Sequence, residues 1–115
     1  MQHIEDNLQR AVCRLLDCYE NAGDLMYFAV PNGGKRNKVT AKILKGIGVK
    51  AGVSDLVIVL PGRVLFVELK APKGRQSQTQ KDFAEKVQSF KHEYHLCRTI
   101  FDVKRLVKSK IRGGA

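Results

Sequence analysis

The chain has 115 residues, of which 21 are Lys or Arg and 11 are Asp or Glu, so its formal net charge is +10. This length supports one hydrophobic core, and we expect a single domain over residues 1–115. No run of apolar residues approaches the roughly 18 that a membrane-spanning helix needs, so we expect no membrane partner. The positive charge favours nucleic acid, although a ribosomal or membrane-surface protein can carry a similar charge.

The cysteine pattern points to a reducing compartment. Cys13, Cys18 and Cys97 are odd in number and contain no Cys-x-x-Cys pair. This argues against a disulfide scaffold or a zinc site. Because the N-terminus also lacks the basic and apolar segments of a secretory signal, we expect a cytoplasmic protein.

Residues 4–21 carry apolar side chains at helical spacing, which predicts an amphipathic helix packed on a sheet. Glu5 falls at the edge of the apolar stripe, so its side chain can face the centre of the protein. The alternative is that Glu5 is a first-turn acid favoured by the helix dipole.

A strand over residues 25–30 and a basic loop over residues 31–38 are expected next. Glycines in this loop let backbone amides approach a phosphate, and the cations attract phosphate without base specificity. The cations are Lys35, Arg36 and Lys38. We expect the loop to hold a DNA backbone, with a solvated turn as the alternative.

A short helix over residues 39–45 is expected before a glycine-rich segment, residues 46–52. The glycines allow a sharp turn into Asp55 and leave room for a substrate. Lys50 lies in this segment and is placed to contact phosphate.

Two apolar runs on either side of a Pro-Gly turn, residues 53–60 and 63–69, predict a β-hairpin. The hairpin brings the start of its first strand beside the end of its second, which places Asp55 next to Glu68 and Lys70. Two adjacent carboxylates repel unless a cation lies between them, and Mg²⁺ with oxygen ligands meets this need. A neighbouring ammonium can orient or deprotonate water. The alternative is that these charges merely cap a buried hairpin.

A second basic loop over residues 71–76 adds Lys73 and Arg75 as candidate phosphate contacts. Ser77 is a good N-cap for the following helix, and Gln80 occupies the capping-box position. The alternative to a functional role is therefore that these two residues serve only to begin the helix.

A strand over residues 94–99 and a helix after Asp102, a candidate N-cap, complete the chain. The order of elements is helix, strand, short helix, hairpin, helix, strand and helix. This order predicts an α/β domain with a mixed central sheet flanked by helices.

The spacing from Asp55 through the hairpin to Glu68-Leu69-Lys70 resembles the nuclease motif of the PD-(D/E)xK superfamily. The segments Gly52-Val53-Ser54-Asp55-Leu56 and Ser77-Gln78-Thr79-Gln80 are similar to the VRR-Nuc (virus-type replication-repair nuclease) family within it. Ser54 replaces the proline of the superfamily motif, as VRR-Nuc members commonly do. The resemblance covers nearly the whole chain and implies a restriction-endonuclease-like core.

The resemblance also implies a Mg²⁺ site, in which Mn²⁺ can substitute, and a lysine that positions or activates water. The implied metal ligands are Asp55, Glu68, Glu5 and the Leu69 backbone carbonyl, and the lysine is Lys70. Gln80 is implied to contact a water or phosphate beside the metal. We expect Ser77 to join the nucleic-acid contacts.

These implications predict a metal-dependent DNA endonuclease that hydrolyses phosphodiester bonds. Small stand-alone relatives act on branched DNA, and a homodimer suits the two-fold symmetry of a four-way (Holliday) junction. A flap- or nick-processing nuclease, a non-catalytic nucleic-acid-binding module and an RNA-directed protein are the alternatives. The family name and the compact chain suggest a bacterial or phage-infected cell.

Overall fold

The computed structural model describes residues 2–31 and 38–112, with side chains for residues 4–31 and 41–111. Lys35 and Arg36 of the predicted basic loop lie outside this range. Lys38, also predicted in that loop, is instead the first residue of a helix.

A four-stranded mixed sheet lies at the centre of the molecule, with the order β1-β2-β3-β4. Its strands are β1 (Met26–Ala29), β2 (Leu56–Leu60), β3 (Arg63–Leu69) and β4 (Glu93–Cys97). The first three strands pair antiparallel in succession, whereas β3 and β4 are parallel. A parallel pair needs a crossover connection, which helix α3 (Gln78–Ser89) supplies.

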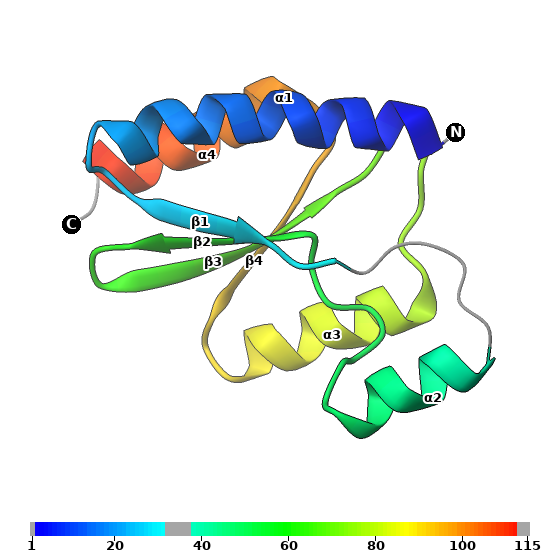
Figure 1. The fold of residues 1–115 in the computed structure, drawn as a ribbon. Coiled ribbons are helices and arrows are strands. Elements are labelled where there is room, and N and C mark those ends of the chain that lie inside the picture. Colours follow the sequence, from blue (N-terminus) through cyan, green and yellow to red (C-terminus); the bar gives the residue numbers. More distant parts are fainter. Residues whose placement is uncertain (1, 32–37, 113–115) are drawn as a thin grey trace.

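Helices cover both faces of this sheet (Figure 1). Helices α1 (Gln2–Asn21) and α4 (Ile100–Arg112) lie together on one face, and α3 lies on the other. The short helix α2 (Lys38–Gly46) lies on the α3 side of the sheet. The predicted α/β fold with a mixed, helix-flanked sheet is therefore confirmed. In the part of the chain described, no helix is both long and apolar enough to cross a bilayer.

The main core lies between the sheet and the α1–α4 layer. Alternate strand residues point to this side, because successive side chains of a strand face opposite ways. The fully buried members are Leu56, Ile58, Leu65 and Val67 of the sheet and Val12, Leu16, Val103 and Val107 of the helices. Burial of each such side chain contributes about 1.5–3 kcal/mol. This packing gives the strand ends of the hairpin a fixed support.

The opposite face of the sheet is covered by an aromatic cluster under α3. Phe83 of α3 packs edge-on against Phe66 of β3 and Tyr94 of β4, at centroid distances of 5.8 and 6.0 Å. These contacts anchor the middle of α3 on the sheet face that carries Phe66 and Tyr94. That is the sheet face on which the charged hairpin residues lie.

The last helix begins earlier than predicted. It starts at Ile100, and Thr99 rather than Asp102 caps it, with the Thr99 Oγ1 accepting the Asp102 N–H at 3.1 Å. The Asp102 carboxylate accepts the N–H groups of Thr99 and Arg98 at 3.1 and 2.9 Å. Asp102 therefore has the inner position of a capping box, in which an acid binds backward to the cap.

Candidate active site

The hairpin register places Asp55 opposite Glu68. Leu56 pairs with Val67, so the residues one step outward face each other at the open end of the strands. The Asp55 Oδ2 accepts the Leu69 N–H at 2.7 Å. This bond fixes the Asp55 carboxylate against the end of β3, beside the Glu68 side chain.

Glu68 is an unusual buried acid. Its side chain is 1% exposed, and its Oε2 accepts a hydrogen bond from the Gln80 Nε2 at 3.0 Å. Its Oε1 is buried and has no hydrogen-bond partner among the residues described. An unpaired buried carboxylate oxygen is costly, since it has lost its water and gained nothing in exchange. This oxygen is suited to a cation.

The two acids also disfavour each other's charge. Burial, and next the charge of Asp55, raise the pKa of Glu68 from 4.5 to about 8. Burial raises the pKa of Asp55 as well, while the Leu69 N–H opposes that rise. The positive charge of Lys70 lowers the pKa of both acids but does not reverse either shift. Full ionisation of the pair therefore calls for a further positive charge.

This pair predicts a pH dependence of stability in protein freed of divalent ions. The folded-state pKa of Glu68 exceeds its ordinary value, so the native state binds more protons than the unfolded state between about pH 4.5 and 8. Stability is therefore expected to fall as pH rises through this window. Urea unfolding in EDTA across the window measures it. Glu68→Gln is expected to flatten this fall, and an equally steep fall in that variant would contradict the assignment to Glu68.

Gln80 serves the helix and the acid pair at the same time. The Gln80 Oε1 accepts the Ser77 backbone N–H at 2.8 Å, and the Gln80 backbone N–H donates to the Ser77 Oγ at 3.2 Å. These bonds form the predicted capping box. Because the Gln80 Nε2 simultaneously binds Glu68, the start of α3 is tied directly to the acid pair. The Ser77 hydroxyl is also within 3.0 Å of the Thr79 hydroxyl.

Glu5 lies at the periphery of the acid pair. It is half-buried, and its Oε2 is 3.4 Å from the position that a Cβ would take at Gly74. Its charge raises the pKa of Asp55 and of Glu68, which places it within electrostatic reach of both. Across residues 2–31 and 38–112, no three His, Cys, Asp or Glu side chains gather into a ready metal site. The structure thus presents a pair of acids with a third acid nearby.

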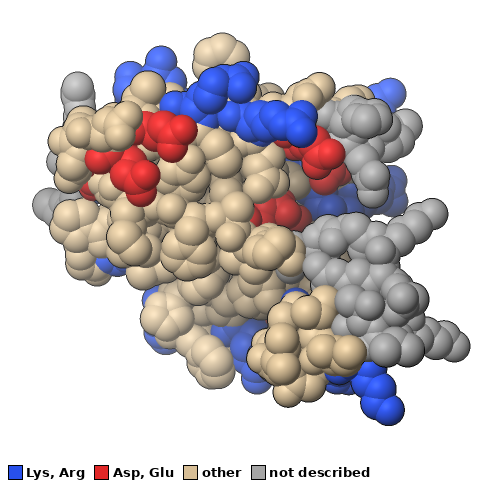
Figure 2. Space-filling view, viewed as in Figure 1, with Lys and Arg blue, Asp and Glu red and all other residues tan. Residues whose placement is uncertain are grey.

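Basic side chains lie around this acidic centre. Figure 2 shows acidic groups in a hollow, with Lys and Arg side chains above and below it. Lys73 and Arg75 are exposed on the loop that leads from β3 to α3. Lys50 lines a cleft together with Lys45, which was not among the predicted phosphate contacts. Such an arrangement suits a polyanion whose backbone passes over the acids.

Arg98 is a further site residue that the sequence analysis missed. It follows β4, and its Nη1 donates to the carbonyl oxygens of Ala71, Pro72 and Gly74 at 2.8, 3.3 and 2.7 Å. The loop that Arg98 holds begins at Lys70 and contains the glycine against which Glu5 lies. No local sequence pattern indicates this role, because the Arg98 side chain and the carbonyl groups that it binds are 24 to 27 residues apart in the chain.

Removal of the Arg98 side chain is expected to loosen this loop. Charged hydrogen bonds contribute about 1.5–3 kcal/mol, so Arg98→Ala should lower the free energy of unfolding by about 2 kcal/mol. Misplacement of Lys70 should also lower the turnover expected of the predicted nuclease on the order of 100-fold. Arg105→Ala is the matched control, since it removes an exposed charge that pairs only at 3.9 Å with Asp102. Equal effects of the two changes on urea unfolding and cleavage would contradict the role of Arg98.

The fold and the arrangement of Asp55, Glu68 and Lys70 define a restriction-endonuclease-like domain. A family model, the VRR-NUC domain, matches residues 7–100. The chain therefore belongs to the VRR-NUC domain family, which is a nuclease family, and the predicted resemblance is confirmed. A solved structure described as a VRR_NUC domain protein is similar, with a TM-score of 0.70 and 20% identity over 94% of this chain and 88% of that chain. No match was found among curated proteins.

Proposed function

We propose that the protein is a Mg²⁺-dependent, structure-specific DNA endonuclease that resolves four-way junctions as a homodimer. The observation that carries the proposal is the pair of the half-buried Asp55 and the buried Glu68, in which the Glu68 Oε1 has no partner in the described structure. In a member of a nuclease family, such an acid pair best supports hydrolysis of a phosphodiester bond. The cytoplasm of a bacterial or phage-infected cell is the proposed location.

The donor set fits Mg²⁺, which prefers oxygen ligands and binds through one or two carboxylates with water and phosphate oxygens. Asp55 and Glu68 would hold the ion, with the Leu69 carbonyl as a further ligand and Glu5 supporting the site from outside the pair. Mn²⁺ has similar ligand preferences and would substitute. When bound, the metal supplies Lewis-acid stabilisation of the reacting phosphate and lowers the pKa of a water.

The chain's own residues would do the remaining work. Lys70, whose charge acts on both acids, positions the attacking water and screens negative charge that develops on the phosphate. Gln80 holds Glu68 in place through the bond to its Oε2. The surrounding cations, Lys50, Lys73 and Arg75 among those described, bind neighbouring phosphates without reading sequence.

The branched substrate and the dimer belong together in this proposal. A four-way junction has two-fold symmetry, and paired cuts on opposite strands are made most simply by two active sites related by a two-fold axis. The net charge of +10 per chain supports binding to the high phosphate density at a branch point.

Cleavage of end-labelled four-way junction, 5′ flap, 3′ flap, nicked and plain duplex, single-stranded DNA and RNA tests the proposal. Each substrate is incubated with Mg²⁺, Mn²⁺ or EDTA, and the mass of the protein–DNA complex is measured by sedimentation. Symmetric paired cuts by a dimer, lost in EDTA and in Lys70→Ala, are expected.

Other results would redirect the proposal. Cutting mainly at a flap or nick by a monomer would retain the chemistry and contradict the junction and dimer. Preference for RNA would contradict the DNA substrate. Binding without metal-dependent cleavage would contradict the enzymatic function itself.

A further inference from the structure

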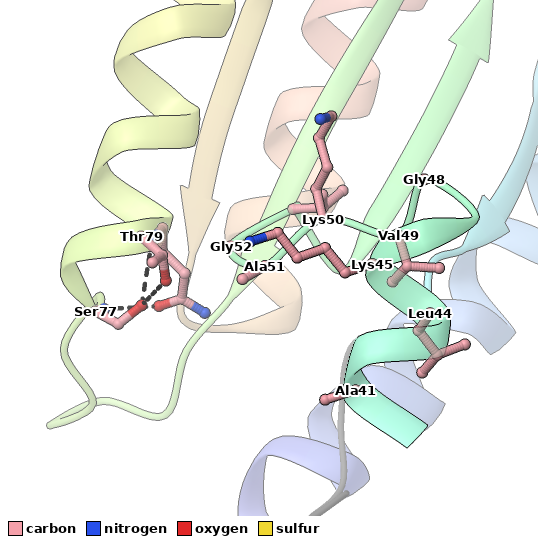
Figure 3. A pocket seen from close by; sticks show the side chains of 12 residues that line it. Ala41, Leu44, Lys45, Gly48, Val49, Lys50, Ala51, Gly52, Ser77 and Thr79 are labelled. Carbon is pink, nitrogen blue, oxygen red and sulfur yellow. Dashed lines mark hydrogen bonds between the residues drawn. The ribbon is translucent and has the colours of Figure 1, made fainter. Parts of the chain in front are cut away.

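A cleft opens beside the acid pair, between α2 with its following loop and the first turn of α3. Its volume is about 640 Å³, within the range of roughly 300–1,000 Å³ that is usual for pockets holding small organic groups. Figure 3 shows the two sides of the cleft, with Ala41 of α2 on one side and Ser77 and Thr79 at the start of α3 on the other. Neither Asp55 nor Glu68 is among its lining residues, so the cleft is separate from the acid pair.

The lining combines apolar walls with positive charge. Leu44, Val49 and Val53 supply apolar surface, and Lys45 and Lys50 supply the charge. None of the described lining residues is acidic. Lys45 extends from α2 toward the start of α3 (Figure 3). A slot that offers apolar surface, the polar groups of Ser77, Thr79 and Gln80, and two lysines is chemically matched to a nucleobase whose own backbone phosphates remain outside.

The cleft is joined to the acid pair through one side chain. Gln80 lines the cleft and donates its Nε2 to the Glu68 Oε2 at 3.0 Å. A group bound in the cleft would therefore be separated from the carboxylate that would hold the metal by the side chain of Gln80 alone. On a DNA strand, this separation suits the nucleotide next to the phosphate that is cut.

We infer that the cleft accepts one unstacked nucleotide of the cleaved strand, next to the scissile phosphate. This inference rests on the proposed nuclease function and adds to it the means of choosing a substrate. A base enters a slot between two walls only after it leaves its stack, which costs a few kcal/mol in intact duplex and least where pairing is already broken. Branch points supply such bases, so the cleft itself selects branched DNA over plain duplex.

The test places 2-aminopurine, which brightens when it unstacks, at each position flanking the cut site of the best branched substrate. Binding is followed in Ca²⁺ by anisotropy and by 2-aminopurine fluorescence, and cleavage is followed separately in Mg²⁺. The filled variant combines Ala41→Leu with Ala51→Leu, both exposed residues on the cleft wall. Ala22→Leu makes the same exchange at an exposed site beyond the far end of α1.

The unaltered protein and Ala22→Leu are expected to brighten one flanking base. The filled variant is expected to retain DNA affinity, because Lys73 and Arg75 lie outside the cleft lining, but to lose the brightening. Its cleavage of branched DNA should fall on the order of 10-fold, because the scissile phosphate is no longer positioned by a base seated in the cleft. Thermal unfolding confirms that each variant is folded.

Two outcomes overturn the inference while the nuclease function stands. One is cleavage of branched DNA with no brightening at any flanking position, and the other is equal brightening and equal cleavage by the filled variant. Failure of the unaltered protein to bind or cleave any DNA overturns the inference and the proposed function together, and anisotropy identifies that case directly.

Discussion

Glu68→Gln is expected to abolish cleavage and, in protein freed of divalent ions, to leave the fold at least as stable as before. If Glu68 holds the proposed metal, its loss removes several kcal/mol of transition-state stabilisation, which at 1.36 kcal/mol per tenfold is a loss of about 1,000-fold or more. Stability behaves differently because Glu68 is 1% exposed, lies beside Asp55 and has an oxygen without a partner. A neutral amide removes the repulsion, and its oxygen can still accept from Gln80.

Glu93→Gln is the matched control on the neighbouring strand. The Glu93 carboxylate contacts the Lys110 Nζ at 2.9 Å, the His95 Nε2 at 3.0 Å and Arg63 at 3.6 Å. The same exchange there removes favourable contacts, so it should lower stability and leave cleavage intact. Urea unfolding in EDTA at about pH 9, with junction cleavage in Mg²⁺, compares the two variants. Retained cleavage by Glu68→Gln, or a larger loss of stability than in Glu93→Gln, would contradict the assigned role of Glu68.

Gly52→Ala is expected to be the most damaging small substitution near the site. Gly52 has φ +81°, and a Cβ there would lie 2.4 Å from the Thr79 carbonyl oxygen in the first turn of α3. Left-handed backbone alone costs a larger residue about 1–2 kcal/mol. The clash adds to this cost because its partner is backbone, so we expect a loss of more than about 3 kcal/mol. Displacement of α3 would also move Gln80 away from Glu68 and lower cleavage on the order of 100-fold.

Gly48→Ala separates backbone strain from the clash. Gly48 lies in the same loop with φ +99°, and a Cβ there would meet nothing within 4 Å. Its substitution should cost only about 1–2 kcal/mol of stability, from backbone conformation alone. Comparison of urea midpoints and cleavage rates measures the difference. Similar losses in the two variants would show that the contact of Gly52 with α3 is not what the site depends on.

The acid pair was predictable because it depends on local geometry. A two-residue Pro-Gly turn fixes the hairpin register, and a shift of one residue would send the apolar side chains to the wrong face. Asp55 and Glu68 were therefore placed opposite each other by pattern alone. The start of α3 was equally local, since Ser77 and Gln80 bind each other within one turn. The cap of α4 was misplaced because Asp102 fits both positions of a capping box.

The sequence by itself thus determined the hairpin, its facing carboxylates and the amphipathic helices, because short-range sterics and hydrophobic periodicity govern these features. Only the tertiary structure decided which distant groups support the acids. Arg98 reaches a loop some 25 residues earlier in the chain, Gly52 lies against Thr79, and Gln80 binds Glu68 while it caps its own helix. These contacts follow from how α3 and the β4–α4 junction pack on the sheet. Such packing depends on the shapes of many side chains together, and no spacing within one segment encodes it.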